Sequence, residues 1–260
     1  MDRPALQSAF HQAADAAGAA IRPYFRSRFS TGDKGSDGVF DPVTEADRAA
    51  EEAIRAVIRE KCPEDGIVGE EFPPHQGTNS RVWVIDPIDG TRSFLCGVPL
   101  FGTIIGLLDK GRPVAGLFDQ PFTGERFFGD AGGSWFLRGD EHSRLGTRST
   151  RTLADALMMT TSPHLFSAEE RPCYSALEAS VRLARYGADG YAYALLAAGQ
   201  IDLVVEAGLQ PYDIVGLIPV IEGAGGIVTA WDGSSAAQGG RVLAAANPAI
   251  HAAAMERLRV

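Results

Sequence analysis

The sequence is short of the residues that build a disulfide framework or a thiolate metal site. It has three cysteines in 260 residues, Cys62, Cys96 and Cys173, with no CxxC pair. An odd and widely spaced set is typical of a reducing compartment and not of a cross-linked secreted domain. The five histidines are scattered as well, so the chain offers no His–Cys cluster of the kind that holds zinc.

Positive charge and long apolar runs are also scarce. The net charge is −9, which argues against a nucleic-acid or anionic-membrane partner because both need a basic surface. The longest apolar run, around residues 97–108, is too short to span a bilayer and contains Pro99 and Gly102. The first twenty residues lack the compact apolar core of a signal peptide. We therefore expect a cytoplasmic protein that binds neither nucleic acid nor membrane.

The first half of the chain is patterned as two helices followed by strands. Apolar residues recur at helical spacing from Leu6 to Phe25 and predict a helix of about six turns. A second helix is predicted from Thr44, with Asp47 in its first turn, to the stop at Cys62-Pro63. Apolar segments between turn residues then predict five strands, the last four as an antiparallel meander, at residues 66–69, 82–85, 101–108, 114–118 and 126–128.

Strands and helices alternate in the second half, which is typical of an α/β arrangement. Strands are predicted at residues 157–161, 181–185, 202–206, 226–230 and 242–246, and helices at residues 168–179, 190–199, 213–224 and from Pro248. No linker or internal repeat separates the halves. We predict one compact unit with an α+β half over residues 1–150 and an α/β half over residues 151–260.

Five acidic residues lie where a predicted strand ends or a predicted helix begins: Asp47, Glu70, Asp86, Asp89 and Asp213. A single acid in such a place is most often a helix cap or a solvated loop residue. Asp86 and Asp89, however, directly follow a buried strand and are three residues apart. Two carboxylates held so close repel each other unless a cation or a proton intervenes.

The segment DPIDGT, residues 86–91, admits three interpretations. An EF-hand calcium loop would need ligands at the positions of Ile88 and Gly97. A phosphatase of the haloacid-dehalogenase type would need its nucleophilic aspartate where Pro87 stands. The third interpretation is a divalent-metal site, in which Pro87 fixes the backbone and Gly90 allows a ligand to approach. Carboxylates, carbonyls and water are the ligands that magnesium prefers, so the segment predicts a magnesium site.

With these residues, the sequence resembles the inositol monophosphatase-like superfamily of magnesium-dependent phosphatases. The motifs that carry the resemblance are GEE at residues 69–71, WVIDPIDGT at 83–91, PYDIVG at 211–216 and EGAGG at 222–226. Residues 97–103, 119–125 and 185–193 resemble the bacterial histidinol-phosphate phosphatase branch. The resemblance implies a layered α-β-α-β-α sandwich of the sugar-phosphatase type and a homodimer.

The resemblance also implies roles for individual residues. Two or three Mg²⁺ would be held by Glu70, Asp86, Asp89, Asp213 and the carbonyl of Ile88. Asp47 and Thr91, with Glu70 nearby, would orient or activate the attacking water. The N–H groups of Gly90 and Thr91 would receive the phosphate, and Asp189 and Glu206 would line the pocket for the alcohol part of the substrate.

These inferences predict a Mg²⁺-dependent phosphomonoesterase that acts on a small phosphorylated metabolite, L-histidinol phosphate. Acidic side chains near the leaving group suit its ammonium and imidazole groups. The alternatives are an inositol-1-monophosphatase, a related sugar or nucleotide phosphatase, and a non-catalytic metal- or phosphate-binding protein; every predicted ligand is present, which disfavours the last. Asp119 and Gln120 are further candidates for the pocket lining, and Lys34 in the loop at residues 30–41 is a candidate to close over the phosphate.

Overall fold

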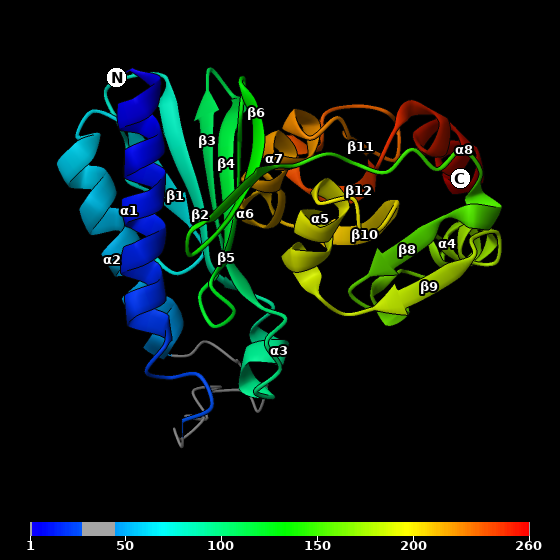
Figure 1. Ribbon diagram of the computed structural model, residues 1–260, viewed down its shortest axis with the longest axis horizontal. Coiled ribbons are helices and arrows are strands. Elements are labelled where there is room, and N and C mark those ends of the chain that lie inside the picture. The colour runs from blue at the N-terminus through cyan, green and yellow to red at the C-terminus, as the bar shows by residue number, and fades with distance from the viewer. Residues whose placement is uncertain (1, 28–44, 260) are drawn as a thin grey trace.

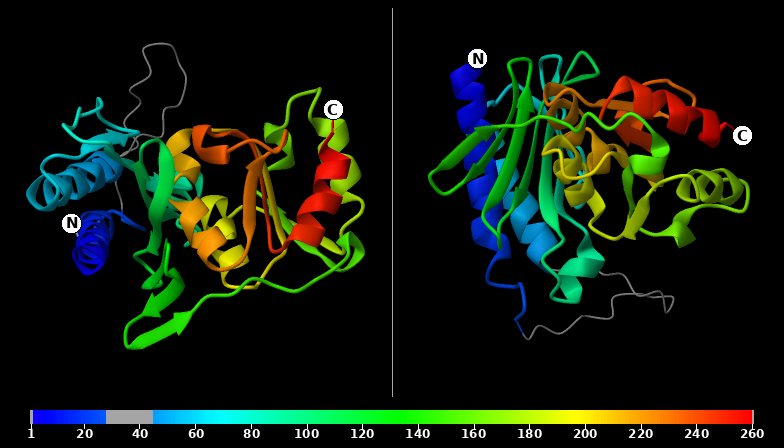
Figure 2. Two further views of the ribbon diagram at one scale, coloured as in Figure 1. Left: turned by 90° about the horizontal axis from the view of Figure 1, so that it is seen from above. Right: turned by 45° about the vertical axis from the view of Figure 1, so that its right-hand side comes forward.

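Two β-sheets alternate with three layers of helices in the computed structural model, which describes residues 2–27 and 45–259 (Figure 1). Helices α1 (Arg3–Ile21) and α2 (Glu45–Lys61) cover the outer face of the first sheet. The view from above in Figure 2 shows the same order of layers across the molecule. The arrangement is the predicted α-β-α-β-α sandwich. Lys34 and the loop at residues 30–41 lie outside the described residues.

The first sheet has seven strands in chain order, with β1 parallel to β2 and the others antiparallel. They are β1 (Gly66–Gly69), β2 (Arg81–Asp89), β3 (Gly102–Asp109), β4 (Arg112–Gln120), β5 (Glu125–Asp130), β6 (Gly133–Arg138) and β7 (Glu141–Arg144). The predicted meander is confirmed, but β6 and β7 were not predicted. All four residues of β7 are exposed, and none of them is apolar, so the strand leaves no hydrophobic pattern to recognise.

The second sheet has five strands in the order β11-β12-β10-β8-β9 and mixes parallel with antiparallel pairs. The strands are β8 (Leu157–Thr160), β9 (Leu183–Tyr186), β10 (Leu203–Leu209), β11 (Ile227–Ala230) and β12 (Gly240–Ala245). Its outer face is covered by α4 (Arg171–Glu178) and α8 (Pro248–Leu258). The predicted alternation of strands and helices is therefore present, with boundaries that differ by a few residues.

Two helices end or break where the sequence pattern continues. The apolar spacing runs on to Phe25, but α1 ends at Ile21, because Pro23 has no N–H to continue the helical hydrogen bonds beyond Arg22. The helix predicted over residues 213–224 is two helices, α6 (Pro211–Ile214) and α7 (Leu217–Gly223). The remaining helices are α3 (Thr91–Leu95), α5 (Asp189–Ala197) and three short 3₁₀ turns. None of the described helices is long and apolar enough to cross a membrane.

A row of glycines lets the middle helices press against the first sheet. Gly106, Gly116 and Gly129 lie side by side on β3, β4 and β5, in direct register. A Cβ at Gly106 would come within 2.7 Å of the Gly216 nitrogen, and a Cβ at Gly116 or Gly129 would overlap the backbone of Gly216 or Pro219. The close approach explains why the chain has glycine at these positions.

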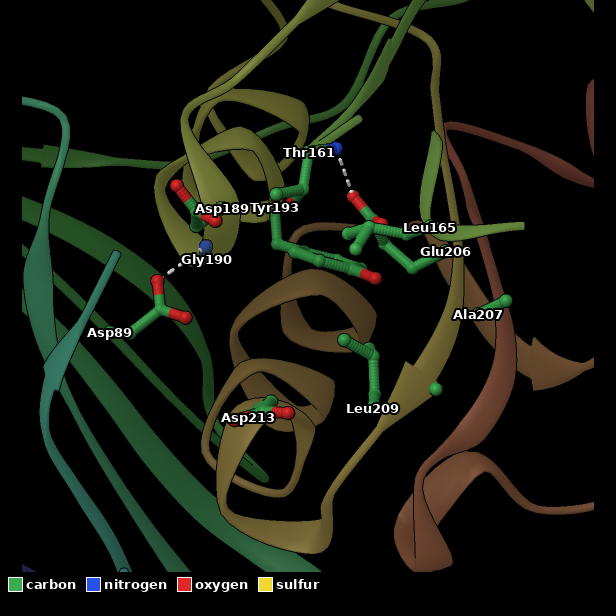
Figure 3. A pocket seen from close by; sticks show the side chains of 11 residues that line it. Asp89, Thr161, Leu165, Asp189, Gly190, Tyr193, Glu206, Ala207, Leu209 and Asp213 are labelled. Atoms are coloured by element: carbon green, nitrogen blue, oxygen red, sulfur yellow. Dashed lines mark hydrogen bonds between the residues drawn. The ribbon is translucent and has the colours of Figure 1, made fainter. Parts of the chain in front are cut away.

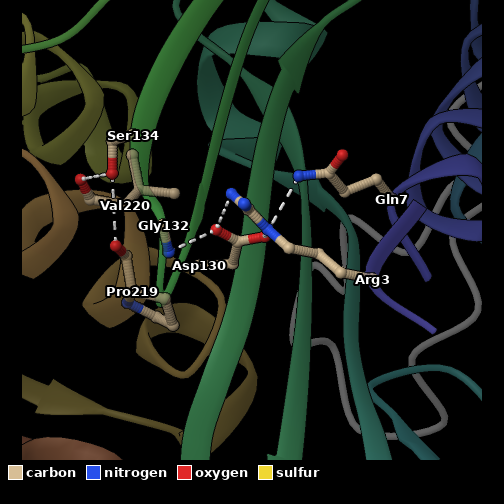
Figure 4. Close-up of polar contacts among 7 residues, drawn as sticks. All are labelled: Arg3, Gln7, Asp130, Gly132, Ser134, Pro219 and Val220. Carbon is tan, nitrogen blue, oxygen red and sulfur yellow. Dashed lines mark hydrogen bonds and ion pairs between the residues drawn. The ribbon is translucent and has the colours of Figure 1, made fainter. Parts of the chain in front are cut away.

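Three hydrophobic clusters fill the spaces between the layers, and side chains of the first sheet bind the helices on both of its faces. Figure 4 shows two of these contacts. Asp130 on β5 accepts hydrogen bonds from Arg3 (2.7 and 2.8 Å) and Gln7 (3.1 Å) of α1. On the opposite face, the Ser134 hydroxyl donates to the carbonyl oxygen of Val220 in α7 at 2.7 Å. The first sheet is thus fixed to the helices on either side of it.

Candidate active site

The structure brings together acidic side chains from distant parts of the chain. Carboxylate oxygens of Asp86, Asp89 and Asp213 lie within 4.8 Å of one another. Asp86 and Asp89 belong to β2 of the first sheet, and Asp213 belongs to α6 in the layer between the sheets. The cluster therefore forms where the two halves of the chain meet.

A β-bulge turns Asp86 and Asp89 toward the same side of the sheet. Side chains three residues apart in a regular strand point to opposite faces. Here Asp86 pairs with Ile104 and Asp89 pairs with Gly102, so β2 has one extra residue between them. The Thr103 hydroxyl donates to the carbonyl oxygen of Pro87 at 2.8 Å and fastens the bulge. The two aspartates were predicted to follow the strand and to be brought together by a turn. They lie within the strand, and the bulge brings them together.

Asp213 is fixed by the first turn of α6. The helix begins at Pro211, so Asp213 stands at the third helical position and does not open the helix as predicted. Its Oδ2 accepts the backbone N–H of Gln210 at 2.7 Å, in a capping box. Gly216, three residues later, packs on the glycine row, which sets the distance from α6 to β2. Asp213 is therefore placed by the contact between helix and sheet.

Glu70 and Asp47 lie close enough to this cluster to interact with it electrostatically. Glu70 follows β1, and Asp47 lies in the first turn of α2 as predicted, with only 3% of its surface exposed. Removal from water and the nearby charges of Glu71, Asp47 and Asp213, among others, raise the pKa of Glu70 to about 7. The acids named from the sequence thus share one region and do not point to separate corners of the fold.

The pKa of Asp86 and that of Asp89 are raised well above the usual aspartate value. Burial is the main cause for both; for Asp86 the next largest is the charge of Asp89, and for Asp89 it is the charge of Asp189. The pKa of Asp213 is raised by burial too, although the N–H of Gln210 opposes the shift. Burial and mutual repulsion therefore favour the protonated forms of these groups unless a counter-charge is present.

The donor set fits a hard divalent cation. Asp86 is 2% exposed, and its Oδ1 is one of the few buried polar atoms with no hydrogen-bond partner in the described part of the chain. An unpartnered buried carboxylate oxygen is costly, and a metal ion would satisfy it. Clustered carboxylates are the ligands that magnesium prefers. The carbonyl of Ile88 is also available, although one of its lone pairs already accepts the Thr91 hydroxyl at 3.1 Å.

A cavity of about 320 Å³ opens beside the cluster (Figure 3). Asp89 and Asp213 line one side of it, and the remaining lining comes from α5, the end of β10 and the loop after β8. In the part of the chain that the structure describes, no lysine or arginine lines it. Glu70, Asp86 and Thr91 do not line it either. A ligand bound at the acidic cluster could therefore extend an organic group into this cavity.

Glu206 is held rigidly in the cavity wall. It is 1% exposed, and its two oxygens accept the Thr161 N–H at 2.5 Å and the Thr160 hydroxyl at 3.3 Å. Burial raises the pKa of Glu206 to about 7, although these hydrogen bonds favour the ionised form. A buried carboxyl with fixed orientation is a suitable partner for a cationic ligand group.

Asp189 reaches the cavity through strained backbone. Ala188 and Asp189 have φ angles of 80° and 42°, which are rare for residues other than glycine. The turn begins α5, whose Gly190 N–H donates to Asp89 Oδ2 at 2.5 Å. Gly90 has a φ of 81°. The space beside its Cα, which was expected to be open to a ligand, is occupied by the carbonyl oxygen of Leu100 and the carboxylate of Asp189. Asp189 therefore lines the cavity and also lies beside Gly90 of the DPIDGT segment.

Two residues that were predicted as candidates for the cavity lining do not line it, and one that was not predicted does. Asp119 pairs with Arg126 at 2.6 Å, and the side-chain oxygen of Gln120 accepts the backbone N–H groups of Phe122 and Thr123, so neither lines the cavity. Tyr193 does line it and was not predicted. Its signal in the sequence was only a position one helical turn after Asp189.

Comparison with known proteins decides the family. The model of the inositol monophosphatase family matches residues 2–259. The chain belongs to the inositol monophosphatase family. It is therefore a phosphoric monoester hydrolase of a metal-dependent family, as the motifs predicted.

Individual relatives in this family differ in the substrates that their names state. The chain is 46% identical to the chloroplastic bifunctional phosphatase IMPL2 of Arabidopsis thaliana, over 94% of this chain and 72% of that protein. It is 37% identical to a histidinol-phosphatase of Chlorobaculum parvum, over 80% of each. An inositol monophosphatase structure from Zymomonas mobilis superposes with a TM-score of 0.87 at 39% identity, over 97% of both chains. The fold and the reaction class are thus shared, and the names cover two substrates.

Proposed function

We propose that this inositol monophosphatase family member hydrolyses L-histidinol phosphate to L-histidinol and phosphate in a Mg²⁺-dependent reaction. The observation that carries the proposal is the cavity beside the acidic cluster, which is lined by Asp189 and Glu206 and by no described basic residue. A phosphate at the cluster would place its alcohol part in this cavity. The ammonium and imidazole groups of histidinol phosphate would then lie near two fixed carboxyls.

In this proposal Glu70, Asp86, Asp89, Asp213 and the Ile88 carbonyl hold two or three Mg²⁺. Bound there, the cations would lower the pKa of a water molecule and stabilise charge on the leaving oxygen, a large part of the roughly 20 kcal/mol that phosphate ester hydrolysis requires.

The remaining residues bind, orient and move protons. The Thr91 hydroxyl, oriented by its bond to the Ile88 carbonyl, orients the attacking water, and the carboxylate of Asp47 accepts the proton of that water. The N–H groups of Gly90 and Thr91, at the first turn of α3, receive the phosphate oxygens. Asp189 and Glu206 bind the cationic groups of the alcohol.

Inositol 1-phosphate is the second candidate substrate. The likeness to the Zymomonas mobilis inositol monophosphatase favours it, and the cavity is large enough for a polyol. A nucleotidase with a second phosphate is disfavoured, because such a substrate would meet Asp189 and Glu206 where it needs cations.

A substrate panel tests the proposal. Phosphate release would be measured with L-histidinol phosphate, inositol 1-phosphate and 3′-phosphoadenosine 5′-phosphate, each with Mg²⁺ and with a chelator. We expect histidinol phosphate to have the highest kcat/KM and every activity to need Mg²⁺. Faster turnover of inositol 1-phosphate would overturn the substrate, and activity in chelator would overturn the metal dependence.

Two further predictions accompany the proposed function. A cytoplasmic homodimer remains our expectation, and light scattering on the purified protein will measure the oligomeric state. The division of the chain into halves at residues 1–150 and 151–260 also stays a prediction, which limited proteolysis will test.

A further inference from the structure

A buried ion pair lies on α2, on the same helix as Asp47 and outside the cavity. Arg55 Nε donates to Glu51 Oε1 at 2.7 Å, and the side chains are 4% and 0% exposed. Ion pairs that are so deeply buried contribute little net stability, because loss of hydration offsets the attraction. Net stability therefore does not explain why Glu51 and Arg55 lie in a hydrophobic layer.

The ion pair contacts the backbone on both sides of Glu70. Glu51 Oε2 accepts the backbone N–H of Glu71 at 2.7 Å, and Arg55 Nη2 donates to the carbonyl oxygen of Phe72 at 3.1 Å. On the other side of Glu70, the Glu51 carboxylate packs directly on Gly69, where an added Cβ would overlap it. Gly69, Glu71 and Phe72 thus all contact one ion pair, the last two through hydrogen bonds.

The same face of α2 carries Asp47. Asp47, Glu51 and Arg55 are spaced four residues apart and are 3%, 0% and 3% exposed, so they form one buried polar stripe. One end of the stripe lies near Glu70 and the acidic cluster, and the other end holds the chain that carries Glu70.

We infer that Glu51 and Arg55 are positioning residues that fix the Glu70 carboxylate for metal binding. The inference rests on the proposed role of Glu70 as a metal ligand. Glu70 follows a strand of only four residues, β1, and belongs to no helix or strand itself. The N–H of Glu70 donates to the carbonyl oxygen of Ile85 at 3.3 Å, and the pair holds the residues on either side of it, so without the pair this one long hydrogen bond remains at Glu70. Partners that orient metal ligands typically affect metal affinity by about 10–100-fold when they are changed.

Two substitutions disturb the contacts between the ion pair and residues 69–72, one at Arg55 and one at Gly69. Arg55→Lys keeps the charge next to Glu51 but removes the planar fork that also reaches Phe72. Gly69→Ala keeps both charged residues but adds a methyl group where the Glu51 carboxylate lies, so the carboxylate has to move. Arg126→Lys is the matched control, since Arg126 bridges Asp119 (2.6 Å) and Asp15 (2.8 Å) and holds no part of residues 69–72.

The measurement is Mg²⁺ binding to the substrate-free protein by calorimetry, with kcat at saturating Mg²⁺ alongside. We expect the dissociation constant for Mg²⁺ to rise roughly tenfold in Arg55→Lys and in Gly69→Ala, with kcat within about threefold of the parent and Arg126→Lys unchanged. A purely structural pair would lower the melting temperature and leave Mg²⁺ affinity as it was. If Arg55→Lys does not fold, Gly69→Ala alone decides.

Glu70→Gln separates failure of this inference from failure of the proposed function. If Glu70→Gln binds Mg²⁺ as tightly as the parent, the proposed ligand role of Glu70 is wrong. If Glu70→Gln binds weakly while Arg55→Lys and Gly69→Ala bind normally, the ligand role holds and the positioning role is wrong.

Discussion

Replacement of Glu206 by glutamine should make the protein more stable and a poorer histidinol-phosphate phosphatase. Glutamine has nearly the same shape, and its oxygen can still accept the Thr161 N–H while its amide donates to the Thr160 hydroxyl. The substitution therefore removes one charge and little else. Stability and activity then respond to the same change in opposite directions.

The stability gain follows from the pKa of Glu206. Burial raises it from an ordinary value of 4.5 to about 7, so the folded state holds the proton more tightly than the unfolded state. Stability is then lost as the pH rises from 4.5 through 7. The ionised carboxylate costs roughly 3 kcal/mol at pH 8 and about 1 kcal/mol at pH 5. Glu206→Gln should recover these amounts because it cannot ionise.

The activity loss follows from the missing charge. A hydrogen bond between a carboxylate and a cationic ligand group contributes about 1.5–3 kcal/mol. We expect kcat/KM for L-histidinol phosphate to fall about 10–100-fold in Glu206→Gln, while that for inositol 1-phosphate, which has no cationic group, stays within about twofold. Asp119→Asn, a buried acid outside the cavity, should leave the ratio of the two substrates unchanged.

Two assays measure these effects. Urea unfolding of the parent and of Glu206→Gln at pH 5 and pH 8, in a chelator, gives the stability difference at each pH. A difference that does not grow between pH 5 and pH 8 would refute the argument from burial. Equal losses of kcat/KM for both substrates would show that Glu206 does not recognise the cationic part of histidinol phosphate.

Three more predictions concern the acidic cluster. Asp86→Asn should abolish detectable phosphate release in an enzyme that circular dichroism shows to be folded; retained turnover would contradict the metal assignment. Mg²⁺ at about 100 times its dissociation constant should stabilise the parent by roughly 2.7 kcal/mol, a shift in thermal unfolding that Asp86→Asn should lack. Since the pKa of Glu70 is about 7, its protonation should weaken Mg²⁺ binding about tenfold at pH 6 relative to pH 8; calorimetry that shows no pH dependence would argue against Glu70 as a ligand.

The parts of this fold that the sequence predicts are those with a local pattern. β3 and β4 are continuous apolar runs bounded by turn residues, and both were located to within a few residues. The DPIDGT segment is also local, since the spacing of Asp86 and Asp89 shows in six letters. Local patterns of this kind reflect the burial and the backbone preferences of neighbouring residues.

Two of the features that were missed at the site depend on pairing or backbone conformation that the sequence does not show. The bulge that brings Asp86 and Asp89 to one side of the sheet depends on how β2 pairs with β3. The break between α6 and α7 was missed although it has a local signal, since Pro219 has no N–H to bond the carbonyl of Val215 and fits only the first turn of a new helix. Asp189 reaches the cavity only through positive φ angles at a non-glycine pair. Neither the bulge nor the pair of positive φ angles has a period or a composition that a single sequence reveals.

The glycine row under α6 and α7 makes proximity to the substrate a poor guide to which positions tolerate change. A single methyl group at Gly116 would meet the backbone of Gly216 and lift the segment that carries Asp213 away from the aspartates of β2. Such a variant would look like a ligand knockout in an assay although it alters no ligand. A survey of harmful substitutions in this chain should therefore find them in the middle of the first sheet as well as around the acids.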